Sequence, residues 1–181
     1  GAVILGPAAC GKTTLLNRTA CGYARDALCG YLGALVPYII PVMQLSSWLI
    51  KNEASLPEAA DIVLEFICHQ CGGKRSELYS ELEHLFRDGN LCLIFDGLDE
   101  AGKKLQEIAT YIGVMLGNSY SGRLIVSSRE SLFDEGHFKH NRWSFLQIQP
   151  LTEQMQLDVL QRRFGSDMLK VTAFQEAQAR S

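Results

Sequence analysis

The sequence predicts a three-layer α/β domain in which helices cover both faces of a mostly parallel five-stranded sheet. Short apolar runs of strand length alternate with longer segments of helical periodicity. The clearest strand, residues 91–95, is apolar throughout, as strands buried on both faces are. Ligands bind such sheets at the carboxyl ends of the strands. The polar residues that follow the strands are therefore the candidates for a functional site.

The expected strands are short, and most are rich in β-branched residues. They span residues 2–5, 36–45, 91–95, 124–126 and 145–148. Pro37 and Pro41 interrupt the second of these runs. Because proline has no N–H to donate to a neighbouring strand, the second strand is expected at an edge of the sheet.

Helical periodicity fills the segments between the strands. Helices are expected after Gly11, from Pro57 to Gly72, up to Gly89, and after the third strand. The apolar residues expected to face inward are Leu15, Leu16, Ile62, Val63, Phe66, Ile67, Leu78, Leu82, Leu85, Phe86, Leu105, Ile108, Ile112 and Met115. Thr152 is expected to cap a last helix, which carries Leu157, Leu160 and Phe164. Residues 1–150 would then form the core domain, and residues 151–181 would begin a following helical domain.

Composition excludes some classes of function. The chain has 181 residues with 17 Lys and Arg against 20 Asp and Glu, a formal charge of -3, so nucleic acid is not an expected partner. No apolar run approaches the roughly 18 residues of a membrane span, and the chain does not begin with a secretory leader. A cytoplasmic location is expected. Because the chain starts at Gly1 and ends within a helical pattern, we expect it to be part of a longer protein.

Six cysteines at irregular spacing favour reduced thiols. Cys68 and Cys71 form a single C-x-x-C, and a zinc site would need two further ligands. Cys68 also falls on the apolar face of its helix, which favours a core position. His137 and His140 form an H-x-x-H that is expected to lie in a solvated loop.

The residues from Gly6 to Thr13 match the motif G-x-x-x-x-G-K-[ST] at every fixed position. The motif stands between a predicted strand and a predicted helix, as a phosphate-binding loop (P-loop) does. The turn brings backbone N–H groups toward phosphate oxygens, and the dipole of the following helix acts in the same direction. A P-loop nucleoside-triphosphatase (NTPase) fold is therefore expected, with strand order 5-1-4-3-2 or its equivalent. The predicted nucleotide-binding residues are Gly6, Pro7, Ala8, Ala9, Cys10, Gly11, Lys12, Thr13 and Thr14.

Acidic residues follow the third strand. Asp96 directly ends it, and with the hydroxyl of Thr13 it is the predicted ligand pair for Mg²⁺. Hydrolysis also needs a group that orients or deprotonates water, and Glu100, with Asp99 beside it, is available for this role. The alternative for both is an acidic pair favoured by a helix N-terminus. The two interpretations are compatible.

Arg129 follows the fourth strand, where it can point at the terminal phosphate. The alternative is a surface salt bridge to Glu130 or Asp134. The N-K-x-D element of guanine-specific GTPases is absent, which favours ATP. Residues 99–102 do match the D-x-x-G of those GTPases, but the strand ends at Asp96, which is the better metal carboxylate.

This set of motifs resembles the NACHT family of signal-transducing NTPases, of the NOD-like-receptor type, within the STAND class. The resemblance covers nearly the whole chain. It is carried by residues 11–16 (GKTTLL), 40–42 (IPV), 96–100 (DGLDE), 127–129 (SSR) and 146–152 (LQIQPLT), and 96–100 is the most specific of these. The chain departs from the family at Ala9, where a second loop glycine is common, and at Glu130, where proline is frequent.

The resemblance implies a molecular switch of a family associated with innate immunity. ADP would hold a closed monomer, and exchange for Mg-ATP would permit oligomerisation and signalling, with slow hydrolysis. Flanking effector and sensor domains would lie outside this chain. Two alternatives stay open: a turnover enzyme, such as a motor-type ATPase or a small-molecule kinase, and a nucleotide-binding interaction module without hydrolysis.

Overall fold

The computed structural model describes residues 1–56, 61–118, 120–138 and 142–164. The chain divides into two compact units, Gly1–Ile148 and Gln149–Ser181, and each is described separately. The described part of the chain contains no helix long and apolar enough to cross a membrane.

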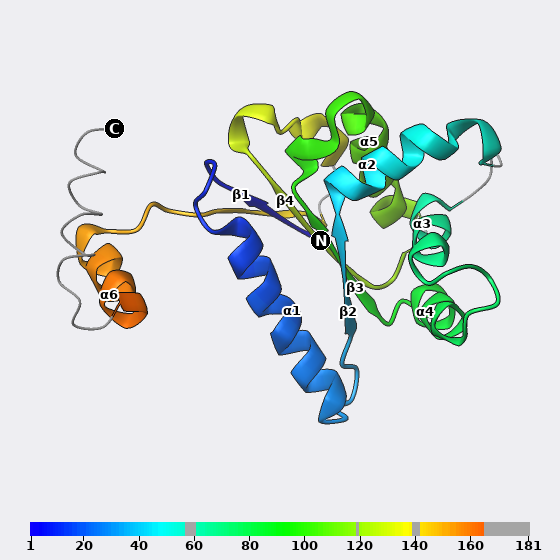
Figure 1. Ribbon diagram of the computed structural model, residues 1–181, viewed down its shortest axis with the longest axis horizontal. Coiled ribbons are helices and arrows are strands. Elements are labelled where there is room, and N and C mark those ends of the chain that lie inside the picture. Colours follow the sequence, from blue (N-terminus) through cyan, green and yellow to red (C-terminus); the bar gives the residue numbers. More distant parts are fainter. Residues whose placement is uncertain (57–60, 119, 139–141, 165–181) are drawn as a thin grey trace. The chain divides into compact units, whose positions relative to one another are not determined.

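A five-stranded, fully parallel sheet forms the centre of the first unit (Figure 1). Its strands are β1 (Ala2–Leu5), β2 (Val36–Pro41), β3 (Leu91–Asp96), β4 (Arg123–Ser128) and β5 (Ser144–Gln147). They lie in the order β2-β3-β4-β1-β5, which is the predicted order 5-1-4-3-2 read from the other edge. The predicted fold class is confirmed.

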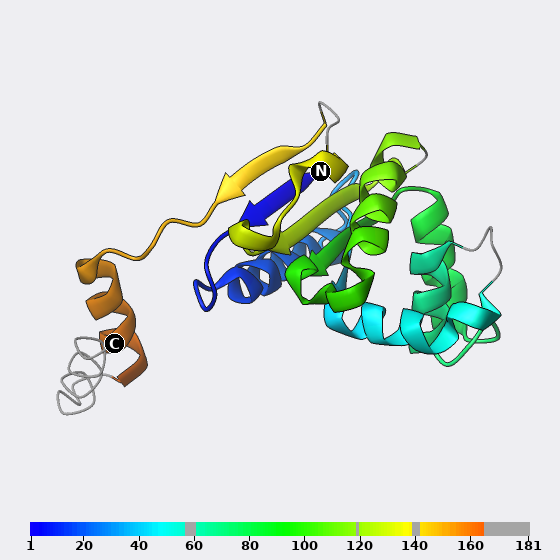
Figure 2. The same cartoon turned by 90° about the horizontal axis from the view of Figure 1, so that it is seen from above.

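Helices cover both faces of this sheet (Figures 1 and 2). The helices of the first unit are α1 (Lys12–Leu28), α2 (Val42–Asn52), α3 (Ile62–Gln70), α4 (Glu77–Arg87) and α5 (Leu105–Asn118). Short 3-10 segments are η1 (Glu53–Ser55), η2 (Leu98–Lys104), η3 (Glu130–Leu132) and η4 (Glu135–Phe138). Helix α1 lies on one face, and α2 to α5 lie on the other.

The alternation of side chains along each strand produces two separate apolar cores. Under α1, the core consists of Ile4, Leu16, Ala20, Cys92, Ile94 and Ile125. On the other face, the neighbouring strand residues Val3, Leu5, Leu91, Leu93, Phe95, Leu124 and Val126 pack with α2 to α5. Both faces of the central strands are therefore buried, as their continuous apolar sequences predict.

The second strand is shorter than its sequence predicts. The expected strand 36–45 ends at Pro41, and α2 begins at Val42. Pro41, with φ -66° and ψ 111°, occupies the position before the first helical residue. Val42, Leu45 and Leu49 then recur at helical spacing and are buried. The prediction of an edge position is confirmed, because β2 pairs only with β3 in the described sheet.

Two inward-facing residues were predicted wrongly. Leu15 and Leu78 are exposed. In α1, Leu16 and Ala20 face the sheet, and Leu15 lies one helical position away from that face. In α4, the buried residues Tyr79, Leu82 and Phe86 follow spacings of three and four, which turns Leu78 outward; the other predicted inward residues of the described helices are buried or partly buried.

Some predictions fall outside the described residues. These are the helix start at Pro57, the side chains of Met115, Leu160 and Phe164, and His140. Within the described part, α3 begins at Ile62, and the carboxylate of Asp61 caps it by accepting the N–H groups of Val63 and Leu64, both at 3.1 Å.

The second unit contributes one described helix, α6 (Glu153–Phe164). Thr152 caps it as predicted, since its Oγ1 accepts the N–H of Met155 at 3.3 Å. The assignment of 151–181 to a following helical domain stays a prediction.

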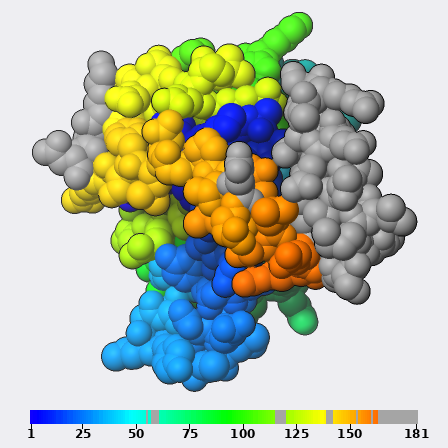
Figure 3. Space-filling view, turned by 90° about the vertical axis from the view of Figure 1, so that its left-hand side faces the viewer, coloured from blue at the N-terminus to red at the C-terminus, as the bar shows by residue number. Residues whose placement is uncertain are grey.

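Exposed apolar side chains gather where α1 ends and the chain turns toward β2. Leu28, Tyr31 and Leu32 are all exposed there. Figure 3 shows this segment in light blue at one end of the face in view. It lies at the amino-terminal edge of the sheet, away from the carboxyl ends where the candidate site is found.

Candidate functional site

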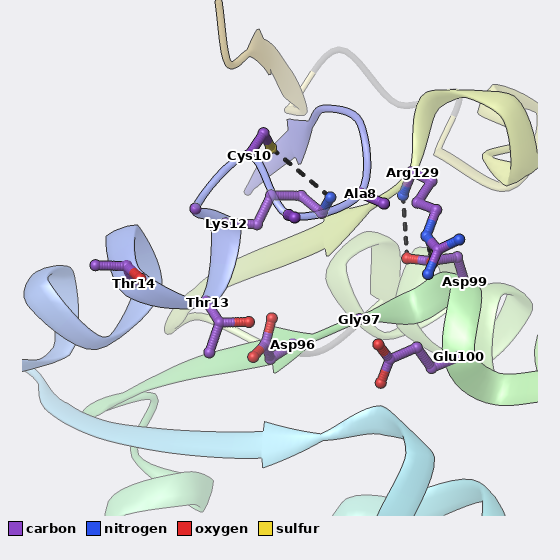
Figure 4. A pocket seen from close by; sticks show the side chains of 12 residues that line it. Ala8, Cys10, Lys12, Thr13, Thr14, Asp96, Gly97, Asp99, Glu100 and Arg129 are labelled. Carbon is purple, nitrogen blue, oxygen red and sulfur yellow. Dashed lines mark hydrogen bonds and ion pairs between the residues drawn. The ribbon is translucent and has the colours of Figure 1, made fainter. Parts of the chain in front are cut away.

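The carboxyl ends of β1, β3 and β4 meet at one edge of the sheet. Leu5 is in register with Ser128, and Phe95 with Val126, so the residues that follow the three strands are neighbours. A cavity of about 310 Å³ opens there (Figure 4). It is lined by Ala8, Ala9, Cys10, Gly11, Lys12, Thr13, Thr14, Asp96, Gly97, Asp99, Glu100 and Arg129. Of the predicted site residues, only Gly6 and Pro7 are not part of this lining.

The loop between β1 and α1 forms one wall of the cavity. Its first residue is tied to the sheet by the Gly6 N–H, which donates to the Ser128 carbonyl at 3.3 Å. Ala9 and Gly11 both have positive φ, at 58° and 94°. These turns are left-handed, and the loop leads directly into the first turn of α1, whose leading N–H groups have no partner within the helix. The helix carries no acidic residue in its first turn, which leaves this end favourable for an anion.

Ala9 stands at a position that favours glycine. A non-glycine residue at φ 58° is uncommon, because Cβ crowds the following carbonyl. This is also the position at which the NACHT family commonly has a second loop glycine. Alanine keeps the backbone turn, and therefore the N–H groups, at the expense of local strain.

The ammonium group of Lys12 lies over the loop. Its Nζ donates to the carbonyls of Gly6 at 2.8 Å and Pro7 at 2.7 Å, and it lies 3.9 Å from the sulfur of Cys10. Gly6 and Pro7 thus take part through their carbonyl oxygens. A Cβ added at Gly6 would lie 2.7 Å from the Cys10 sulfur, so a larger residue there would displace the Cys10 side chain.

Asp96 and Thr13 face each other across the cavity, with their side chains directed toward one another (Figure 4). The Asp96 carboxylate is held from the side by Ser127, whose Oγ donates to its Oδ1 at 2.8 Å. The same Oγ accepts the N–H of Gly97 at 2.8 Å. Ser127 is fully buried, so its hydroxyl serves these two contacts alone among the described residues.

Ser127 is the residue whose role the sequence did not reveal, although it lies within the segment 127–129. Its signal is a hydroxyl residue that directly follows the apolar run 124–126. The register of β4 against β3, with Phe95 opposite Val126, then places this hydroxyl beside Asp96.

Gly97 turns the chain from β3 into η2. Its φ of 78° and ψ of 58° are left-handed. A Cβ at this position would lie 3.0 Å from Cδ of Glu100 and 3.1 Å from its Oε2. The turn therefore brings Glu100 back against Gly97, where its exposed carboxylate points into the cavity (Figure 4). Segment η2 is anchored from α2, because the buried Ser46 Oγ donates to the Ala101 carbonyl at 2.6 Å.

Asp99 and Arg129 form an ion pair at the cavity wall. Asp99 Oδ2 lies 2.9 Å from Arg129 Nε, and Oδ1 accepts the backbone N–H of Arg129 at 3.0 Å. The Asp99 side chain is only 4% exposed, against 47% for Arg129. The salt bridge of Arg129 is thus to Asp99 and not to Glu130 or Asp134. Glu130 instead accepts from Gln147 at 3.0 Å.

The donor set at Asp96 fits a magnesium ion bound together with phosphate. The described residues contain no group of three or more His, Cys, Asp or Glu side chains placed to hold a metal ion alone. Mg²⁺ typically takes one or two protein oxygens and completes its shell with water and phosphate oxygens. Thr13 and Asp96 match that limited contribution.

The C-x-x-C of α3 lacks the features of a metal or redox site. Cys68 is buried in the core, as predicted. Burial raises the pKa of both the Cys68 and the Cys71 thiols, which disfavours the thiolate that a metal requires.

Comparison of the sequence with protein-family models and with curated proteins gave no match. Among solved structures, the chain is similar to the ORC1 protein of Aeropyrum pernix, determined in complex with DNA. The TM-score is 0.54 with 15% sequence identity, and the match covers 90% of this chain and 43% of that one. At this identity the similarity concerns the fold alone. Together with the strand order and the loop between β1 and α1, it identifies the first unit as a P-loop NTPase fold.

Proposed function

We propose that this chain binds ATP with Mg²⁺ and acts as a nucleotide switch of the NACHT type. The observation that carries the proposal is one cavity that combines the P-loop and Lys12 with the facing pair Thr13 and Asp96. An anion cradle and a metal carboxylate at the same strand ends are the two parts that every P-loop nucleotide site needs.

The triphosphate would lie along the loop and the first turn of α1. Backbone N–H groups and the helix dipole supply attraction that does not depend on side chains. The Lys12 ammonium, now on the Gly6 and Pro7 carbonyls, is a single flexible cation within the same loop. It would transfer to the β- and γ-phosphates when nucleotide binds, because a phosphate oxygen is a stronger acceptor than a neutral carbonyl.

The metal would be held by Thr13 and Asp96, with the remaining ligands from phosphate and water. Glu100 would orient the attacking water, since its carboxylate is exposed to the cavity and carries no ion pair among the described residues. Arg129 would contact the terminal phosphate. ATP would then make contacts with Arg129, Lys12 and the metal that ADP lacks. These contacts would give the two nucleotides different affinities, and a switch can respond only to such a difference.

The switch itself would operate within a longer cytoplasmic protein. Exchange of ADP for ATP would permit self-association through the NTPase domain, with effector and sensor domains flanking it. The formal charge of -3 gives no support to a nucleic-acid partner. DNA binding belongs to the ORC1 structure and is not proposed for this chain.

Titration calorimetry of the chain with ATP, GTP and ADP, each with and without Mg²⁺, tests the proposal. We expect magnesium-dependent ATP binding that is tighter than GTP binding. Lys12→Ala should abolish triphosphate binding while the melting curve followed by circular dichroism stays cooperative. Lys103→Ala, on the exposed side of η2, is the matched control and should bind as the wild type does. A GTP preference would overturn the base assignment, and retained ATP affinity in folded Lys12→Ala would overturn the phosphate site.

A further inference from the structure

We infer that Asp99 is a positioning residue for Arg129: it accepts the backbone N–H of Arg129, pairs with the guanidinium at Nε, and so directs the two Nη groups to the terminal phosphate. This inference rests on the proposed function and assigns different tasks to the two adjacent carboxylates, Asp99 and Glu100. Both were open candidates for water activation from the sequence.

The Asp99 carboxylate is fully committed to one residue. One oxygen is 2.9 Å from Arg129 Nε, and the other accepts the backbone N–H of the same residue at 3.0 Å. The carboxylate therefore fixes both the backbone at the end of β4 and the first nitrogen of the guanidinium. Two contacts to one residue define a direction for the side chain, which a single contact would not.

Burial of the Asp99 carboxylate favours this ion pair. The Asp99 side chain is 4% exposed, and a buried carboxylate without a cationic partner is strongly unfavourable. The partner is supplied across 30 residues of sequence by Arg129. Both carboxylate oxygens are thus already engaged by Arg129, one by its backbone N–H and the other by its guanidinium, which disfavours Asp99 as the group that activates water.

The far end of the guanidinium is available. Among the described residues the Nη atoms of Arg129 donate no hydrogen bond, and the side chain is 47% exposed and lines the cavity. Arginine offers five N–H donors in a planar fork, and four of them are on the Nη side, away from the Nε that pairs with Asp99. That side of the fork is the one suited to paired contacts with phosphate oxygens.

Glu100 differs from Asp99 in the exposure and in the direction of its side chain. It is exposed, points into the cavity and is backed by Gly97. After the left-handed turn at Gly97, the Asp99 carboxylate lies against Arg129 at the cavity wall, and the Glu100 carboxylate points into the cavity. Asp99 acts through Arg129, and Glu100 faces the site where water would react.

The test is the affinity of Asp99→Asn for ATP and ADP, measured by titration calorimetry on the whole chain with Mg²⁺. Asparagine can still accept the Arg129 N–H, but it is neutral and cannot form the ion pair with Nε. We expect ATP affinity to fall by about tenfold to a hundredfold, as the loss of one charge-assisted phosphate contact implies, with ADP affinity unchanged within about twofold. Arg129→Gln should show the same loss, and the double variant should lose no more than either single one.

Asp134→Asn is the matched control, because this carboxylate lies five positions after Arg129 and is exposed. It should leave both affinities unchanged. If Asp99→Asn fails to fold, Arg129→Lys provides the second measurement: lysine can pair with Asp99 but has no second nitrogen to offer, so the ATP preference should be lost.

The outcomes separate the two proposals. Wild-type protein that binds neither nucleotide, or binds both equally, would contradict the proposed function itself. Wild-type protein with an ATP preference that survives in folded Asp99→Asn, or in Arg129→Lys, would overturn the positioning role of Asp99 and leave the proposed function standing.

Discussion

The hydroxyl of Ser127 donates a 2.8 Å hydrogen bond to the carboxylate of Asp96 and accepts the N–H of Gly97 at the same distance. Strand β4 thereby sets the orientation of the carboxylate that ends β3. Because the hydroxyl occupies Oδ1, the other oxygen of Asp96 is the one left for a metal ligand opposite Thr13. The geometry of the proposed magnesium site is thus fixed by a residue that does not line the cavity.

Ser127→Ala should weaken magnesium-dependent ATP binding. The substitution leaves the Gly97 N–H unpaired in a buried place and frees the Asp96 carboxylate to rotate, so we expect a loss of about 1–3 kcal/mol in stability. ATP affinity should fall about five- to tenfold in Mg²⁺ and remain unchanged in EDTA. Calorimetry with and without the metal measures both values.

Ser128→Ala is the matched control for this prediction. Ser128 is equally buried in β4, but among the described residues its hydroxyl hydrogen-bonds only to the carbonyl of Arg129, at 3.2 Å. It should keep the magnesium dependence of the wild type. A Ser127→Ala variant with unaltered magnesium dependence would show that Asp96 needs no support from β4.

Gly97→Ala should destabilise the domain and displace Glu100. At φ 78°, alanine costs about 1–2 kcal/mol, and its Cβ would lie 3.0 Å from Cδ of Glu100. Chemical denaturation should show the loss of stability, and turnover should fall because the carboxylate shifts.

Gly22→Ala is the comparison variant, and its stability is expected to change in the opposite direction. Gly22 lies within α1, and a Cβ there meets no atom within 4 Å. Alanine in a helix interior is more favourable than glycine by roughly 0.5–1 kcal/mol, so this variant should gain stability. If Gly97→Ala were as stable as the wild type, the left-handed turn would not be a requirement of the segment 96–100.

The fold was predictable from the sequence because its signals are local. Strand and helix periods alternate, and polar residues follow the strands, so a parallel sheet with Gly6, Asp96 and Arg129 at one edge was predictable. The strand order was predicted only through the P-loop motif and the fold that this motif implies. The boundary at Pro41 was not predictable in the same way. An apolar run that contains β-branched residues suits a buried strand or a buried helix, and only the packing of Val42, Leu45 and Leu49 decides between them.

The different roles proposed for Asp99 and Glu100 depend on tertiary geometry. Asp99 and Glu100 are adjacent in sequence, and nothing in their types distinguishes them. The turn at Gly97 and the position of β4 bring Asp99 to Arg129, and this contact spans 30 residues. For the same reason, the register of β3 with β4 was needed to identify Ser127 as the partner of Asp96.

Alkaline pH should destabilise the domain through buried tyrosines. Burial raises the pKa of Tyr79 from 10.0 to about 12, with a further contribution from the nearby Glu83. The folded state therefore keeps the phenol proton that the unfolded chain releases, and stability falls as pH rises from about 10 to about 12. Urea denaturation at several pH values should show a shallower decline in Tyr79→Phe than in the wild type. The stability of Tyr31→Phe, a variant at an exposed position, should decline with pH as that of the wild type does. Equal slopes of stability against pH in all three proteins would contradict the effect of Tyr79.

Glu100→Gln should keep ATP binding and stop hydrolysis. Glutamine preserves the size of the side chain against Gly97 but cannot take a proton from water, and the loss of a general base typically lowers a rate by roughly 10²–10⁴. Single-turnover measurements with radiolabelled ATP would compare this variant with Glu135→Gln, an exposed control in η4. Slow wild-type turnover that is lost only in Glu100→Gln would support a switch, whereas fast turnover would favour a motor-type ATPase. Tight ATP binding with no turnover in the wild type would favour an interaction module, and turnover that Glu100→Gln leaves unchanged would remove Glu100 from the reaction.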